Sequence, residues 1–280
     1  MGALTLPGGL MFHSRVLRRV RLRPITGRIE RRVAQLLSGE RSPACISAVM
    51  ACTASSIDGV ALTAERAAAL CVADRQWFML QLGIALSGDQ VWLSCKCASC
   101  GGEFDVGYTR SAVPVSSSAS PYPFAEAVIA AGAFRMRVPT GGDQQAIWDA
   151  SDPDALERVL LRRCVLEVRR GDEPIDPDLV LAELSEADLD ELDARLDAVA
   201  PSVATHISTA CLECGGAQRV PIDPYDVWSH GTFSRGSALD EEVHILACNY
   251  HWSEREILSL TLPLRRRYLA LIDRQRGMAS

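Results

Sequence analysis

The sequence predicts an α+β protein that is mainly α-helical, and two observations carry this prediction. Apolar residues recur at helical spacing in most long segments, as they do at Leu189, Leu192, Leu196 and Val199. Two short cysteine-containing phrases are instead flanked on both sides by alternating residues typical of β-strands. The pattern divides the chain into an N-terminal β and helical region, a first cysteine phrase, a linker with a helical insertion, a second cysteine phrase and a C-terminal helical region (1–90, 91–109, 110–204, 205–224 and 225–280).

Side chains that can cap helices indicate where several helices begin. Thr26 precedes GRIERRVAQLL, Thr63 precedes a helix that leads towards DRQWFMLQLGIAL, and Ser185 precedes EADLDELDARLDAV. Ser253 and Glu256 form a capping box before EREILSL. Further helices are expected near Asp143, over 152–163 with Pro153 in the first turn, over 239–252 and, after an interruption at Pro263, over 264–276.

Alternating residues predict strands on both sides of each cysteine phrase. VWLSC and EFDVGYT flank the first phrase, and ATHIST and AQRVPID flank the second. Val20 and Leu22 alternate in the same way before Pro24, and FRMRV indicates another short strand. Residues 112–123 are rich in serine and proline, so they are predicted to form a loop.

Composition and charge describe a soluble globular chain. Of the 280 residues, 48% are hydrophobic and 23% are charged, and no apolar run approaches the roughly 20 residues that span a bilayer. The arginines of the N-terminus follow a short apolar patch, so we expect no secretory signal and a cytoplasmic protein. The net charge is −6, with eight arginines over 15–32 and an acidic run over 172–197. Both runs can be interpreted as solvated faces of the protein. Alternatively, the basic run is an interaction surface for a protein or an anionic partner.

The phrase C-x-x-C-G-G-x-x-x-V occurs twice, as CASCGGEFDV from Cys97 and, 114 positions later, as CLECGGAQRV from Cys211. It is the pattern of a zinc knuckle, in which two thiolates approach one metal and a glycine after the second cysteine permits the positive φ of the turn. One knuckle offers two ligands, whereas structural Zn²⁺ takes four. The two phrases therefore predict one structural zinc site in a split zinc ribbon, with the ligands Cys97, Cys100, Cys211 and Cys214.

Two alternatives remain for these cysteines. The phrases could be degenerate hairpins that no longer hold metal, or a thiol redox pair, although neither C-x-x-C opens a helix, the arrangement that lowers a thiol pKa. Cys95 could compete as a ligand, but Thr209 holds the matching position in the second phrase, so Cys95 is interpreted as a spectator. The other five cysteines lie in apolar helical segments, which is typical of small buried side chains.

The sequence contains none of the common catalytic motifs. H-E-x-x-H, G-x-S-x-G and a P-loop are absent, and PTGGDQ lacks the lysine of a phosphate-binding loop. His244 and His251 share one face of a predicted helix and are interpreted as packing residues. Four thiolates leave zinc without an open position, so the metal would not activate water. We therefore expect a protein that is not an enzyme and has no small-molecule substrate.

The most distinctive block lies near the C-terminus, where Tyr250-His251-Trp252-Ser253-Glu254 is followed by Arg266-Arg267-Tyr268-Leu269. Together with LRPITGRIERRV, DRQWFML and RVPTGGDQQA in the same order, it resembles the T4-type bacteriophage baseplate protein family of contractile-tailed phages and phage-like injection systems. The sequence departs from the family pattern in the glycines of Thr140-Gly141-Gly142-Asp143 and in its serine-rich 110–123 loop.

The resemblance implies an assembly chaperone or minor component of the baseplate hub that binds hub or spike proteins and carries no catalytic residues. Arg, Tyr and Trp often anchor protein interfaces, so the candidate partner surface consists of Trp252, Arg265, Arg266, Arg267 and Tyr268. Alternatively, the two aromatic residues belong to the core and the arginines cover a helix end.

A second hypothesis is a zinc-ribbon adaptor that binds nucleic acid, or a regulatory protein. The arginines of 15–32 would then contact the phosphate backbone. The acidic net charge and the presence of a single lysine, Lys96, do not favour nucleic acid as the partner.

Overall fold

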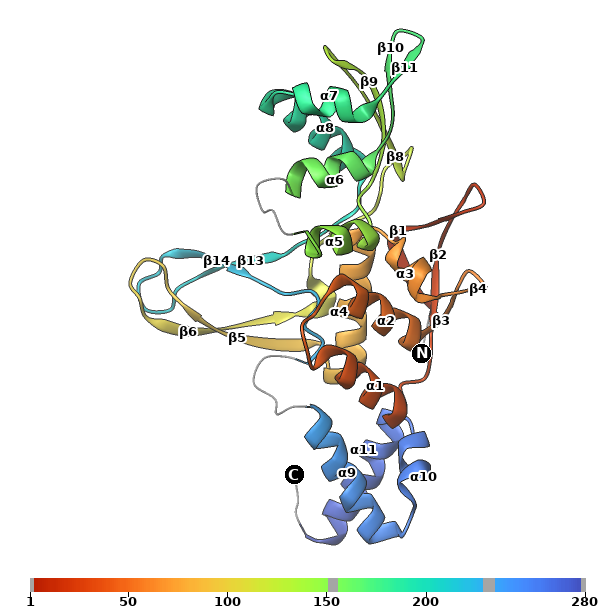
Figure 1. The fold of residues 1–280 in the computed structure, drawn as a ribbon. Coiled ribbons are helices and arrows are strands. Elements are labelled where there is room, and N and C mark those ends of the chain that lie inside the picture. Colours follow the sequence, from red (N-terminus) through yellow and green to blue (C-terminus); the bar gives the residue numbers. More distant parts are fainter. Residues whose placement is uncertain (1–2, 151–155, 229–234, 278–280) are drawn as a thin grey trace.

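The computed structural model describes residues 3–150, 156–228 and 235–277. About 45% of the residues are helical and about 30% lie in strands, which form five antiparallel sheets among the described residues. The expectation of a mainly helical chain is therefore wrong, and the protein is a mixed α+β structure. Figure 1 shows a central N-terminal body with two long hairpins on one side, an inserted unit at one end and the C-terminal helices at the other.

The N-terminal body, residues 3–87, packs helices against a four-stranded sheet of order β1-β2-β3-β4. The core joins strand residues such as Leu6 and Val20 to helix residues such as Val49 and Phe78, all of them buried. The elements are β1 (Ala3–Phe12), β2 (Arg15–Leu22), α1 (Gly27–Leu37), α2 (Pro43–Thr53), β3 (Ala54–Ile57), β4 (Val60–Ala61), α3 (Ala64–Ala68) and α4 (Val72–Ser87).

Caps predicted from the sequence begin two of these helices. The Thr26 side chain accepts a hydrogen bond from the Ile29 amide at the start of α1, and Thr63 caps α3 in the same way. Helix α2 has no counterpart among the predicted helices. Ser42 caps it and Pro43 occupies its first turn, which is a start signal that the sequence does carry.

Two hairpins form what we call the cysteine arm. β5 (Gln90–Lys96) pairs with β6 (Glu103–Thr109), and β13 (His206–Ala210) pairs with β14 (Ala217–Pro221), which confirms the four strands predicted around the cysteine phrases. Both hairpins project from the same side of the body in Figure 1. Phe104, Val106 and Val220 are buried with Cys97 and Cys211 in a small core at the cysteine end of the arm.

The insertion, residues 110–204, is not the helical segment that the sequence predicts. It contains a four-stranded antiparallel sheet of order β11-β10-β9-β8, with helices on one face (Figure 1). Phe134 of the sheet and Leu192 of a covering helix share its core. The elements are a 3₁₀ turn (Arg110–Ala112), β7 (Val115–Ser116), β8 (Phe124–Ile129), β9 (Gly132–Arg137), α5 (Gly141–Trp148), α6 (Leu156–Cys164), β10 (Val165–Arg170), β11 (Glu173–Ile175), α7 (Pro177–Glu183), α8 (Glu186–Val199) and β12 (Ser202–Val203).

Several predictions within the insertion can be compared directly with these elements. Ser185 caps α8 as predicted. Short strand β7 pairs with β12, so the predicted loop of 112–123 includes two paired residues. The helix expected over 152–163 corresponds to α6, and Pro153 lies outside the described residues.

The C-terminal unit, residues 235–277, consists of α9 (Arg235–Tyr250), α10 (Glu254–Ser259) and α11 (Leu262–Gln275). The capping box of Ser253 and Glu256 is confirmed at the start of α10. Pro263 lies in the first turn of α11, where a missing amide proton costs nothing. The longest described helices, α4 and α9, have 16 residues each, and no described helix has the length and apolar character needed to cross a membrane.

Candidate metal centre

The two cysteine phrases adopt the same turn at the ends of their hairpins. The Cys97 amide donates to the Gly102 carbonyl (2.8 Å), and the Gly101 amide donates to the Cys97 carbonyl (3.0 Å). In the second hairpin the Cys211 amide donates to Gly216 and the Gly215 amide donates to Cys211, both at 2.9 Å. Gly101 has a φ of 76° and Gly215 a φ of 70°, a backbone region that favours glycine. The glycine after each second cysteine is thus required by the turn.

These turns bring four sulfur atoms from the two hairpins together. All four Sγ atoms of Cys97, Cys100, Cys211 and Cys214 lie within 4.8 Å of one another. Cys97 Sγ is 3.7 Å from Cys214 Sγ, and Cys100 Sγ is 3.8 Å from Cys211 Sγ. Zn–S bonds of about 2.3 Å in a regular tetrahedron place sulfur atoms about 3.8 Å apart, whereas a disulfide requires about 2.05 Å. The spacing therefore suits four ligands around one metal ion and not a disulfide.

Hydrogen bonds and proximity give two of the thiols very different pKa values. The backbone amides of Cys100 and Ser99 donate to Cys97 Sγ and lower the Cys97 pKa to about 6. The Gly102 amide acts in the same direction on Cys100, but the neighbouring thiols of Cys97 and Cys214 outweigh it and raise the Cys100 pKa to about 12. Four thiolates this close repel one another, so the fully ionised set needs a cation between them.

One side of the cluster faces protein and the other faces solvent. Cys97 and Cys211 are each 2% exposed, whereas Cys100 and Cys214 are exposed. A hydrogen bond of 3.0 Å from the Ala98 amide to Gln218 Oε1 links the two hairpins beside the sulfurs. The cluster is therefore open to a metal from solvent while its inner half is fixed by packing.

The structure brings together the four cysteines that the spacing predicts, and they could hold a metal ion. Cys95 lies outside this group, which agrees with its interpretation as a spectator. No other cluster of three or more potential metal ligands occurs within the described ranges. Four cysteine ligands would occupy every position of a tetrahedral ion and leave none for water or a substrate.

The structure separates the residues of the predicted partner surface. Arg265 is fully buried, so it is not part of an exposed surface: it forms ion pairs with Glu30 of α1 and Glu242 of α9. Arg266 and Arg267 are exposed, and Arg266 also donates to the Leu86 carbonyl.

The two aromatic residues of that surface are neither core nor fully exposed. Trp252 and Tyr268 are half-buried, with ring centroids 5.0 Å apart at nearly perpendicular planes. Tyr250 stacks on Trp252 with a centroid distance of 4.8 Å. Such an aromatic group stabilises the C-terminal unit through ring packing while part of its surface faces solvent.

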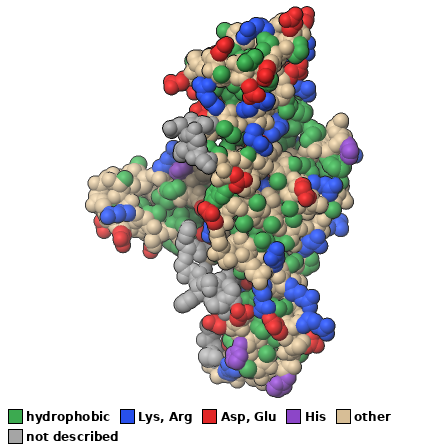
Figure 2. Space-filling model, viewed as in Figure 1, with side chains coloured by type: hydrophobic (Ala, Val, Ile, Leu, Met, Phe, Trp, Pro, Cys, Tyr) green, Lys and Arg blue, Asp and Glu red, His purple; other side chains and the backbone are tan. Residues whose placement is uncertain are grey.

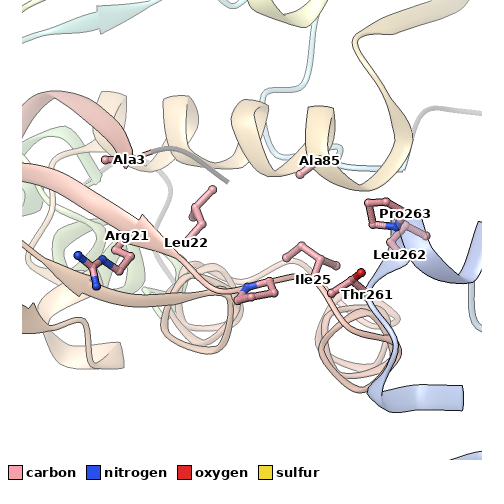
Figure 3. A pocket seen from close by; sticks show the side chains of 9 residues that line it. Ala3, Arg21, Leu22, Ile25, Ala85, Thr261, Leu262 and Pro263 are labelled. Carbon is pink, nitrogen blue, oxygen red and sulfur yellow. The ribbon is translucent and has the colours of Figure 1, made fainter. Parts of the chain in front are cut away.

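The structure also contains cavities that the sequence does not predict. One of about 610 Å³ lies between the body and the C-terminal unit, where Leu22 and Ile25 approach Leu262 and Pro263 (Figure 3). Arg21 is the one charged residue that lines it, and this side chain is exposed. Every buried side-chain nitrogen or oxygen of its lining residues has a hydrogen-bond partner, so this cavity gives no indication of a polar ligand.

Comparisons of the chain with protein-family models, with curated proteins and with solved structures found no match. The resemblance to the baseplate family consequently stays a prediction from the sequence segments named above.

Proposed function

We propose that this protein is a non-enzymatic assembly factor, or a minor component, of the baseplate hub of a contractile tail or phage-like injection system. One structural Zn²⁺ holds its cysteine arm together. The sequence resemblance supports a role in baseplate assembly, and the cluster of four sulfurs supports the binding of a metal ion.

The observation that carries the proposal is the closed set of four sulfurs from hairpins that are 111 to 117 residues apart in the chain. Soft thiolate ligands in a tetrahedral arrangement select Zn²⁺ or an iron–sulfur centre, and a single ion matches the sulfur spacing. Zinc held by four thiolates contributes shape and not a reaction. A metal that fixes the end of a projecting arm suits a protein that binds other proteins.

The arm offers exposed apolar side chains that a protein partner could bury. Trp92 of β5 is 65% exposed and lies against Gly107 of β6, and Leu212 is 83% exposed between two of the cysteines. Tryptophan is enriched among the residues that dominate interface energies. We propose that the arm contacts hub or spike subunits, and that Arg267, Trp252 and Tyr268 of the C-terminal unit form a second contact.

Affinity capture from cells that carry the tail gene cluster tests this function. The tagged full-length protein should recover hub or spike subunits, and the double variant Trp92→Ala/Leu212→Ala should recover about tenfold less. Leu179→Ala on α7, which removes an equally exposed leucine far from the arm, is the matched control. The proposal fails if no baseplate subunit is recovered and a deletion strain still assembles functional tails.

Nucleic-acid binding through residues 15–32 has less support. Arg31 forms ion pairs with Asp240 and Glu254, and Arg18 donates to Ser118 Oγ, so these side chains already have partners within the chain. Figure 2 shows basic and acidic side chains interspersed on the visible face. A gel shift at low salt is the deciding measurement, since binding that weakens steeply with added salt would favour the adaptor hypothesis over the one proposed.

A further inference from the structure

A second cavity, of about 560 Å³, lies where five distant parts of the chain meet: the start of α2, the first turn of α4, helices α5 and α6, and the loop after β14. Its volume falls within the range of about 300–1,000 Å³ that is usual for small-molecule sites. The lining is largely apolar and includes Pro43, Ile46, Val72, Ile147, Trp148 and Leu160.

Arg75 stands out in this lining, because it is fully buried and pairs with no carboxylate among the described residues. Its guanidinium donates to Ser47 Oγ (2.9 Å) and to the carbonyl oxygens of Ala67 (2.9 Å) and Pro43 (2.6 Å). The Nε atom is buried and has no hydrogen-bond acceptor. Burial lowers the pKa of Arg75, as expected for a cation without a counter-ion.

Among the other buried charges, Asp74 accepts hydrogen bonds from the Gly8 and Gly9 amides, and others have ion-pair partners. Arg265 has two glutamates, and Asp143 has two arginines, Arg137 and Arg163. A buried charge without a partner is costly, and natural proteins rarely retain one. No carboxylate of the described residues pairs with Arg75, so a ligand carboxylate would supply the negative charge that is absent there.

Gly141 makes room for this guanidinium. A Cβ atom at Gly141 would lie 2.4 Å from Arg75 Cζ, so any larger residue would displace the arginine. The first glycine of PTGGDQ therefore has a local role, because it lets the start of α5 pass close over Arg75.

A second polar group lies at the same end of the cavity. The buried Tyr225 hydroxyl interacts with Arg75 and Gln144 beside it but has no close hydrogen-bond partner. Arg41 lines the cavity too, but Asp223 (3.0 Å) and Asp226 (3.8 Å) neutralise it. The cavity thus combines a guanidinium that pairs with no carboxylate of the described residues, a tyrosine hydroxyl beside it and an apolar remainder.

We propose that this cavity binds an organic monocarboxylate with an apolar, flat body. The carboxylate accepts hydrogen bonds from Arg75 and Tyr225, and the body packs against Trp148 and Leu160. A single negative charge matches the one arginine of this lining that pairs with no described carboxylate, whereas a phosphate would bring a second charge into an apolar site without a partner. The inference does not depend on the metal centre or on the baseplate function.

Binding is measured on the full-length, metal-loaded protein by saturation-transfer NMR and calorimetry, with indole-3-acetate and phenylacetate as probes. Their carboxamides are the matched neutral controls. At least one carboxylate should bind with a Kd below about 1 mM. The Kd of its carboxamide should be at least about tenfold higher. Carboxylates that bind no better than their amides, or that show no binding at about 10 mM, would overturn the proposal.

Two variants locate the site without removing Arg75, whose three hydrogen bonds also support the fold. Tyr225→Phe removes only the hydroxyl and should weaken binding about tenfold, while Leu160→Trp fills the cavity and should abolish binding. Leu179→Ala is the distant control. Circular dichroism verifies that each variant is folded, and unchanged affinity in folded Tyr225→Phe would place the ligand elsewhere and overturn the assignment.

Discussion

The cysteine arm and the C-terminal unit both extend from the same body, but different chemistry holds each in place. Among the described residues, the core cluster of the arm has five buried members, two of them cysteines, and a separate cluster within the C-terminal unit has three, Leu246, Ile257 and Ile272. Neither core is large enough to stabilise a free-standing unit. In the arm, a metal held by the four sulfurs would compensate for this deficit, and in the C-terminal unit a buried ion-pair network links it to the body.

Metal coordination and the buried ion pairs differ in whether they can be removed without unfolding the protein. Metal coordination depends on solution conditions, because chelators and acid remove the ion. The Arg265 network is enclosed between α1, α9 and α11, and backbone hydrogen bonds from Gly27 to Leu260 and from Leu262 to Ile25 accompany it. The structure of the arm should therefore depend on whether metal is bound, whereas the structure of the C-terminal unit should not.

The largest effect is expected from removing one sulfur of the arm. Cys211→Ser should reduce bound zinc from about one ion per chain to less than about 0.1. The apparent free energy of binding at structural zinc sites, about 10–16 kcal/mol at neutral pH, depends on the complete ligand set. Metal analysis measures the stoichiometry. Hydrogen exchange should show loss of protection in β5, β6, β13 and β14 but not in α9 to α11.

Cys95→Ser is the matched control for that change, because Cys95 lies on the same arm but outside the cluster. It should retain one zinc per chain. Full zinc binding by Cys211→Ser, or exchange that spreads into the C-terminal unit, would contradict a separate, metal-dependent arm.

A smaller but still large effect is expected at the other attachment. Arg265→Met removes the ion pair with Glu30, which is 1% exposed, and should lower the free energy of unfolding by about 3–5 kcal/mol. Urea denaturation measures this, with zinc content unchanged. Arg267→Met on the exposed face of the same helix should change stability by less than about 0.5 kcal/mol. Equal effects of the two substitutions would mean that the buried network does not hold the C-terminal unit.

The smallest of the three effects on stability is expected at Asp143, which lies at the start of α5 in the insertion. Burial alone would raise its pKa, but hydrogen bonds from Arg137 and Thr140 lower the pKa to about 2. The folded pKa lies below the unfolded value of about 3.9, so the stabilisation is fully present above about pH 4 and is lost as the pH falls towards 2. We expect a contribution of about 2 kcal/mol at neutral pH.

Urea unfolding of the metal-free protein and of Asp143→Asn at pH 7 and pH 3 measures this contribution without interference from zinc loss. The destabilisation caused by the substitution should shrink at the lower pH. Asp149→Asn, at the exposed end of the same helix, should cost less than about 0.5 kcal/mol at pH 7. A destabilisation that is the same at both pH values would show that the Asp143 charge does not contribute.

The cysteine cluster was predictable because its signal is local and repeated: each phrase fixes its own turn, and the ligand number of a metal joins the two. The burial of Arg265 was not predictable in this way. It stands in a run of three arginines, and its partner Glu30 is 235 residues away in the chain. Pairings over such distances follow from packing and leave no local pattern.

Strand β9 matches the predicted FRMRV strand, but the other three strands of the insertion's sheet escaped prediction for a different physical reason. The inward positions of β8 are Ala125 and Ala127, and alanine is a poor strand former. In β10 a bulge between Val165 and Glu167 breaks the alternation of buried and exposed residues. Helix α2 lacks a clear apolar stripe in the sequence because small apolar residues, such as Ala48 and Cys52, also occupy the side opposite its buried residues.

The distance between the two cysteine phrases also has a consequence for biosynthesis. The first pair of thiols leaves the ribosome more than 100 residues before the second, which at usual rates is a delay on the order of ten seconds. During that time the nascent chain exposes a half-built chelator, and the insertion has emerged in full before the last ligands arrive. With the proposed zinc site, metal capture would be a late step that closes the insertion into a loop, and the zinc supply during translation would limit how many chains complete the site.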